Sequence, residues 1–146
     1  MPYLRVVNVV DDPLSSLISD DPVRPEIPIN NRIGPHAELL FLCREQDMVD
    51  AVLCVKYCQH IPKTVNDLLS DLGANNIAVF YSVWSYSNGA GRDIIRQAVS
   101  HILSTRVTVN RFITLSPKTD LALRFHTRNG AFILSENEDT VNYEYP

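Results

Sequence analysis

The sequence has few glycines, no long apolar run and only a mild net charge. Five glycines in 146 residues are too few for a collagen-like or glycine-rich disordered chain. Nowhere do about 18 apolar residues follow one another, as a membrane-spanning helix requires, and no basic start precedes a long apolar run. We therefore expect a cytoplasmic protein that does not enter a membrane. The formal charge of −4 is spread along the chain, so no basic stripe is available to bind nucleic acid.

Cysteine is also scarce. Cys43, Cys54 and Cys58 are odd in number and lie in apolar runs, which is typical of thiols that pack as small hydrophobic side chains. A zinc site is the alternative interpretation of Cys54 and Cys58. Because neither a CxxC pair nor a Cys/His pair with the spacing of a structural zinc site accompanies them, we predict no metal.

The length of the chain sets the domain organisation. A chain of 146 residues can bury one sizeable core but not two independent ones, so we expect a single domain over residues 1–146. Its first 36 residues are predicted to be irregular. Tyr3 to Val10 is β-branched and predicts a strand, and Asp12-Pro13 offers a cap and a first-turn proline for a short helix. Four prolines within residues 21–35 then predict an extended loop.

Strands and helices alternate along the rest of the chain. Two apolar, β-branched runs around a polar turn predict an antiparallel hairpin over residues 38–58, and the run at 76–85 is apolar on both faces, as in a central buried strand. Leucines at helical spacing predict a helix from Thr64 to Leu72 that Gly73 ends. The remaining predicted elements are a helix through Ile94–Leu103, a strand at 111–115, a helix from Thr119 to Asn129 closed by Gly130, and a hairpin over 131–145.

A glycine loop joins the predicted strand at 76–85 to the helix that follows. Glycines at the start of a helix let several backbone N–H groups point at one anion, and the helix dipole adds a favourable potential. Ser87-Asn88-Gly89-Ala90-Gly91 could therefore hold a pyrophosphate. The alternative is a tight turn without a ligand. The dinucleotide-binding GxGxxG pattern and the Walker loop both need residues that this loop lacks.

In their order, the predicted elements resemble the GNAT fold of the acyl-CoA N-acyltransferases over residues 36–135. The family's loop has Arg or Gln, two residues, Gly, any residue, then Gly or Ala, and residues 86–91 are similar to it except at Tyr86. The resemblance implies an α/β (α+β) fold with a mixed, mainly antiparallel central sheet of six to seven strands flanked by helices. It also implies that coenzyme A, as an acetyl or malonyl thioester, binds without a metal at Val83, Ser85, Ser87, Asn88, Gly89, Ala90, Gly91 and Arg92.

Three segments, in the same order, resemble the malonyl-CoA decarboxylase family more closely. They are Phe80-Tyr81-Ser82, Leu115-Ser116-Pro117 and the segment from Phe125 to Ala131, with the sequence FHTRNGA. The resemblance implies that His126 and Ser116 are catalytic, with His126 at the position where GNAT enzymes usually have a tyrosine acid. The sequence shows no counterpart of the decarboxylase's helical N-terminal domain, and only nine residues separate the serine from the histidine.

Three functions remain open from the sequence. Decarboxylation of a malonyl-CoA-type thioester would use His126 as the acid that protonates carbon, and Ser116 to hold the carboxylate or the histidine. Acetyl transfer to an amine acceptor would use His126 as the general acid towards the leaving thiolate. A non-catalytic acyl-CoA-binding module would need neither role. Structural roles also account for both residues, with Ser116 capping a helix that begins at Pro117 and His126 as a hydrogen-bonded core or surface histidine.

Overall fold

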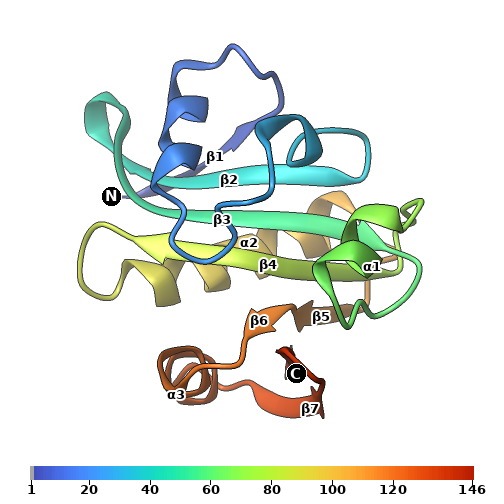
Figure 1. Ribbon diagram of the computed structural model, residues 1–146. Coiled ribbons are helices and arrows are strands. Elements are labelled where there is room, and N and C mark those ends of the chain that lie inside the picture. Colours follow the sequence, from blue (N-terminus) through green and yellow to red (C-terminus); the bar gives the residue numbers. More distant parts are fainter. Residues whose placement is uncertain (1) are drawn as a thin grey trace.

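The computed structural model describes residues 2–146 and contains one mixed sheet of eight strands (Figure 1). The strand order is β1-β2-β3-β4-β5-β8-β6, and β7 pairs with β8. β4 and β5 run parallel, and the other strand pairs are antiparallel. The strands are β1 (Tyr3–Val7), β2 (Ala37–Arg44), β3 (Met48–Cys58), β4 (Ile77–Ser85), β5 (Arg111–Thr114), β6 (Ser116–Pro117), β7 (Phe132–Glu136) and β8 (Thr140–Tyr145).

The mixed, mainly antiparallel sheet confirms the predicted fold class, although it has one strand more than the upper end of the predicted range. The additional strand is β6, whose two residues pair with Val141 and Thr140 of β8. A two-residue strand has no side-chain alternation of its own, so the sequence could not reveal it.

The described residues form three α-helices and three short 3-10 helices. They are α1 (Val65–Ser70), α2 (Ala90–Thr105), α3 (Asp120–Arg128), η1 (Pro13–Asp20), η2 (Ile29–Asn31) and η3 (Glu45–Asp47). Figure 1 shows η1 and the loop after it in front of the sheet and α2 behind it. Among residues 2–146, no helix has the length and apolar character needed to cross a membrane.

Both faces of the sheet are covered, which explains why β3 and β4 are apolar on both sides. On one face, Ile94, Ala98 and Ile102 of α2 pack against the strands. On the other face, Ile27 of the proline-rich loop and Leu68 of α1 do so. Cys43, Cys54 and Cys58 are free, buried thiols in this second core, as expected for small apolar side chains.

Two predicted elements are shorter in the structure. β1 ends at Val7 rather than Val10, because a turn follows in which the N–H of Asp12 donates to the carbonyl of Val9 at 3.3 Å. The carboxylate of Asp12 then accepts the N–H of Leu14 at 2.9 Å and caps η1. The short helix predicted here is therefore present, but as a 3-10 helix.

The helix predicted to reach Leu72 ends at Ser70. The carboxylate of Asp71 accepts the N–H groups of Gln59, at 3.0 Å, and Gly73, at 2.8 Å. Because of these bonds the chain leaves the helical conformation after Ser70. Leu72 is therefore 84% exposed and does not lie on the buried face of the helix. Gly73 does have the predicted left-handed conformation, with a φ of 90°.

β4 is irregular at the point where it leaves β5. Its register with β3 shifts between Cys54 and Val55, which leaves Tyr81 as an extra residue on β4. Such a bulge bends a strand and increases its twist. β5 accompanies β4 as far as Phe80, and the N–H of Leu115 makes the last bond, to the carbonyl of Phe80 at 3.1 Å. Beyond Phe80 the two chains separate.

Candidate functional site

A cavity of about 520 Å³ lies where β4 and β5 separate. Its walls come from the second half of β4, the start of α2, the segment after β5, α3 and the turn after η1. The cavity brings together five of the predicted site residues, which are Val83, Ser85, Gly91, Ser116 and His126. The predicted catalytic residues therefore share one cavity with part of the predicted coenzyme A site.

The cavity follows an unpaired edge of β4. The N–H of Tyr86 donates to the carbonyl of Asp50 at 2.7 Å, and residues in an antiparallel pair alternate between bonded and non-bonded positions. By the register of β3 and β4, Trp84 also pairs with β3, whereas the main-chain groups of Val83 and Ser85 point to the edge that β5 has left. An extended ligand that carries amide groups can pair with this edge as a further strand would.

One end of the cavity lies at the glycine loop. Gly89 is the N-cap of α2 and has a φ of 80°, in the left-handed region that favours glycine. The N–H of Ala90 donates to the carbonyl of Ser87 at 3.3 Å. Within residues 2–146 the next two amides, of Gly91 and Arg92, have no partner, as is usual in the first turn of a helix. Two free N–H groups at the positive end of the helix dipole can bind an anion.

The other predicted coenzyme A residues adjoin the cavity without lining it. They are Ser87, Asn88, Gly89, Ala90 and Arg92. Ala90 is buried against the sheet, and the others are exposed around the start of α2. They are thus placed to surround a phosphate group at the helix end, while Gly91 is the residue that connects this end to the cavity.

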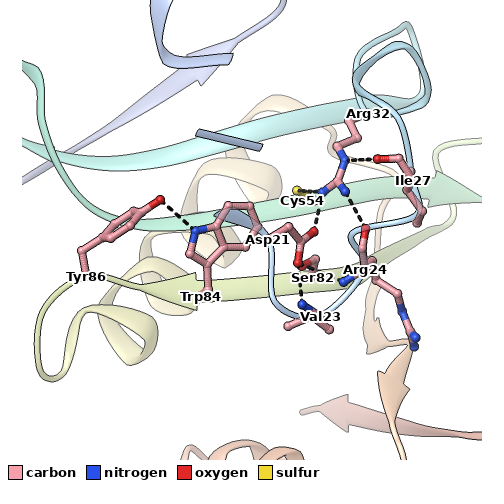
Figure 2. A network of polar contacts seen from close by, with 9 residues as sticks. All are labelled: Asp21, Val23, Arg24, Ile27, Arg32, Cys54, Ser82, Trp84 and Tyr86. Carbon is pink, nitrogen blue, oxygen red and sulfur yellow. Dashed lines mark hydrogen bonds and ion pairs between the residues drawn. The ribbon is translucent and has the colours of Figure 1, made fainter. Parts of the chain in front are cut away.

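Tyr86, which differs from the family's loop pattern, links β4 to the N-terminal segment. Its hydroxyl accepts the indole N–H of Trp84 at 3.1 Å (Figure 2) and donates to the carboxylate of Asp20 at 2.8 Å. Half of the side chain remains exposed. Its polar group is therefore occupied by bonds within the protein.

His126 projects from α3 into the cavity wall and is only 5% exposed. Its Nδ1 atom lies 2.7 Å from the hydroxyl of Tyr145, and its ring stacks on Tyr143 at a centroid distance of 5.0 Å. Burial lowers the pKa of His126 from 6.5 to about 4, so the ring is neutral at pH 7. Burial also raises the pKa of Tyr145. That hydroxyl therefore keeps its proton and can donate it to Nδ1, which leaves the ring proton on Nε2.

Ser116 lies in β6 and is 4% exposed. Its hydroxyl donates to Thr114 Oγ1 at 2.8 Å, and Thr114 Oγ1 also accepts the N–H of Tyr143 at 3.0 Å. The interpretation of Ser116 as a helix cap is wrong, because Thr119 caps α3 by accepting the N–H of Ala122 at 3.2 Å. Ser116 instead pairs with Val141 of β8 as part of the sheet. Its hydroxyl oxygen can still accept a hydrogen bond.

The sequence patterns do not reveal the residues from other parts of the chain that line the cavity or hold His126. Tyr145 was predicted only as part of a hairpin, and Pro22 and Val23 only as part of an extended loop. Both of these loop residues line the cavity. No local pattern signals these contacts, because Pro22 and Val23 are about 60 to 100 positions from the other lining residues and Tyr145 is 19 positions from His126.

The comparisons with known proteins identify the fold. No family model matches the sequence. No curated protein matches it either. Among solved structures, malonyl-CoA decarboxylase from Agrobacterium vitis is similar over 85% of this chain and 35% of its own, with a TM-score of 0.70 and 21% identity. This chain thus spans about a third of the length of the decarboxylases that it matches.

Acetyltransferases are similar over more of their own length. An acetyltransferase from Bacillus subtilis in complex with CoA has a TM-score of 0.68 and 10% identity, covering 99% of this chain and 98% of that one. The Campylobacter jejuni N-acetyltransferase PseH in complex with acetyl coenzyme A has a TM-score of 0.55 and 11% identity, covering 76% and 68%. Together with the glycine loop and the separated β4 and β5, these likenesses show that the chain has the GNAT fold.

Proposed function

We propose that the cavity binds a CoA thioester, with the pyrophosphate at the start of α2 and the pantetheine arm along β4. The free amides of Gly91 and Arg92 supply donors for phosphate oxygens. The unpaired edge at Val83 and Ser85 supplies main-chain groups for the amides of the arm. Two solved structures of similar fold are described as complexes with CoA or acetyl coenzyme A, which supports the same ligand here.

At this site, our proposed reaction is the decarboxylation of a malonyl-CoA-type thioester. The observation that carries the proposal is that Ser116 and a neutral His126 line one cavity. The likeness to malonyl-CoA decarboxylases supports it further. In this reaction the bond between the carboxyl group and the α carbon breaks, and its electron pair forms an enolate with the thioester carbonyl. Carbon dioxide leaves, and the α carbon takes up one proton to give an acetyl thioester.

The neutral state of His126 defines its part in this proposal. Its Nε2–H group donates to the thioester oxygen, where negative charge develops as carbon dioxide leaves. A neutral imidazole can do this without first gaining a proton. The same group then gives its proton to the α carbon, and solvent restores it. Ser116 positions the carboxylate so that the breaking bond lies in line with the carbonyl π system.

The test is release of carbon dioxide from malonyl-CoA by the purified chain, alongside binding of free CoA measured by calorimetry. His126→Gln should abolish release and leave CoA binding unchanged, because the glutamine removes the imidazole but not the phosphate-binding amides. His101→Gln is the matched control, since His101 lies outside the cavity wall, 3.5 Å from Glu38. A chain that binds CoA but releases no carbon dioxide would rule decarboxylation out.

Acetyl transfer to an amine is the second candidate. It is favoured by the acetyltransferase from Bacillus subtilis, which this chain matches over 98% of its length. The pKa of about 4 weakens the case for His126 as a protonated general acid towards the thiolate. Free thiol that rises only when an amine is added to acetyl-CoA would select this function. Tight CoA binding without either reaction would select a non-catalytic acyl-CoA-binding module.

A further inference from the structure

One end of the cavity lies where β4 and β5 come together. Phe80, Leu115 and Ser116 line this end, together with Pro22 and Val23 from the turn after η1. Phe80, at this end, is five residues before Ser85, the last residue of β4. At 3.3 Å per residue, this separation is about 17 Å. If the pyrophosphate lies at α2, the acyl group lies at this end.

A buried carboxylate fixes the turn that forms part of this end (Figure 2). Asp21 Oδ1 accepts the N–H groups of Val23 and Arg24, at 2.7 and 2.9 Å, and the hydroxyl of Ser82 at 2.7 Å. Asp21 Oδ2 lies 2.6 Å from Arg32 Nη1, and both side chains are completely buried. The charge of Asp21 is therefore compensated by Arg32, and its oxygens are occupied.

Arg24 is a buried cation without a counter-ion. Its side chain is directed away from the pair formed by Asp21 and Arg32 (Figure 2), and its Nη2 donates to the carbonyl of Leu115 at 3.0 Å. The residue is 8% exposed, its Nε has no hydrogen-bond partner, and it makes no ion pair within residues 2–146. Burial lowers the pKa of Arg24, and two carboxylates raise it through their charge, those of Glu26 and Asp21. Glu26 is exposed to solvent, and Asp21 is paired with Arg32. Burying an uncompensated charge is costly, so a nearby anion would be strongly favoured.

We propose that Arg24 selects acyl groups that end in a carboxylate, by holding a positive charge behind the wall formed by Val23 and Leu115. The inference rests on the proposed function, because it needs the acyl group at the end of the cavity lined by Val23 and Leu115. Arg24 does not itself line the cavity. Its charge therefore acts on the carboxylate through the wall and not through a direct ion pair.

This arrangement suits loss of the carboxylate. A direct ion pair between Arg24 and the carboxylate would strongly stabilise the bound substrate. Stabilisation of this ground state does not speed the reaction. A charge behind an apolar wall also attracts the anion, but it stabilises the bound carboxylate less than a direct ion pair would. The neutral wall of Val23 and Leu115 also suits carbon dioxide, which is formed as an uncharged molecule.

Two inert ligands test the selection by calorimetry. S-(2-carboxyethyl)-CoA is a thioether that carries its carboxylate as many bonds from sulfur as malonyl-CoA does, and it cannot lose carbon dioxide. S-propyl-CoA is the matched ligand with a methyl group in place of the carboxylate. The quantity measured is the ratio of their dissociation constants, and free CoA reports on the phosphate site alone.

The chain as it stands should prefer the carboxylate ligand about tenfold, the size expected for one charge acting at an intermediate distance. Arg24→Gln should remove the preference and leave the dissociation constants of S-propyl-CoA and free CoA unchanged. Arg24→Lys should retain most of the preference because it retains the charge. Arg128→Gln is the control, since it removes an equal charge from the exposed end of α3 and should not alter the ratio.

The outcomes separate this inference from the proposed function. If none of the three ligands binds, the proposed function fails. If they bind and the chain shows no carboxylate preference, or if Arg24→Gln keeps the preference, the role of Arg24 is rejected and the proposed function stands. Should Arg24→Gln not fold, Arg24→Lys and Arg24→Met, compared by the same ratio, decide the question.

Discussion

The hydroxyl of Tyr145 lies 2.7 Å from Nδ1 of His126, and both side chains are buried. The bond joins α3 to β8 and fixes the proton of the neutral ring on Nε2. His126 has no carboxylate partner within residues 2–146, and burial disfavours its charged form. The pair is therefore suited to hold a neutral imidazole in one tautomer, and this has consequences for activity and for stability.

Removing the tyrosine hydroxyl should reduce turnover more than binding. Tyr145→Phe leaves the aromatic ring in place but lets the imidazole change its tautomer. The loss of one buried hydrogen bond, about 1 kcal/mol, predicts a fall of about fivefold to tenfold in the rate of carbon dioxide release. The dissociation constant for free CoA should not change. Tyr143→Phe is the control, because the ring of Tyr143 stacks on His126 without a hydrogen bond between them. Equal losses in the two variants would contradict the proposed role of the hydroxyl.

The low pKa of His126 also predicts acid sensitivity. In the unfolded chain its pKa is 6.5 and in the folded chain about 4, so between these values the unfolded state binds the proton and the folded state does not. The free energy of unfolding must then fall as the pH falls from 7 to 4, by on the order of 3 kcal/mol from this residue. Urea unfolding at several pH values measures the effect. His126→Gln should have a flatter profile over that range, and an unchanged slope would show that another group is responsible.

Local patterns explain how much of the fold could be predicted. Ile94, Ala98 and Ile102 recur at helical spacing and do form the buried face of α2. Gly89 was expected at a helix start and is the N-cap of α2. These features depend on residues close in sequence, where periodicity and backbone conformation leave a direct signal.

The remaining features of the site depend on contacts between distant segments. Asp71 ends α1 through the N–H groups of Gln59 and His60, which follow β3, and helical spacing alone cannot reveal this. Arg24 lies beside Leu115, a separation of 91 positions, and Tyr145 lies beside His126 only because β8 returns to the sheet next to β5. From the sequence alone, such residues can be assigned to a loop or a strand but not to their distant contacts.

Gly91 allows α2 and α3 to approach each other beside the cavity. A Cβ atom at this position would lie 3.0 Å from Cε1 and 3.1 Å from Cζ of Phe125, and Phe125 also lines the cavity. Gly91→Ala should therefore displace the ring, lower the free energy of unfolding by about 1–3 kcal/mol and weaken CoA binding. Thermal unfolding and calorimetry measure the two effects.

The control for Gly91 is Gly34→Ala, where no atom lies within 4 Å of the added Cβ and the backbone is not in the left-handed region. That variant should leave CoA binding unchanged. If Gly91→Ala binds CoA as tightly as the unsubstituted chain, displacing the ring of Phe125 does not disturb the ligand site.

The buried pair of Asp21 and Arg32 should contribute to stability mainly as a pair. Arg32→Met leaves the carboxylate of Asp21 buried without its counter-ion, which is expected to cost about 3–5 kcal/mol in the free energy of unfolding. Arg44→Met breaks an ion pair with Asp50 in which the arginine side chain is 51% exposed, and it should cost within about 1 kcal/mol. Urea unfolding of both variants gives the comparison.

The double variant Asp21→Asn with Arg32→Met removes both charges. It should recover part of the lost free energy of unfolding, because an uncompensated charge and not the missing contact is the larger cost. A double variant no more stable than Arg32→Met would instead assign the cost to the hydrogen bonds that Arg32 makes to the carbonyls of the proline-rich loop.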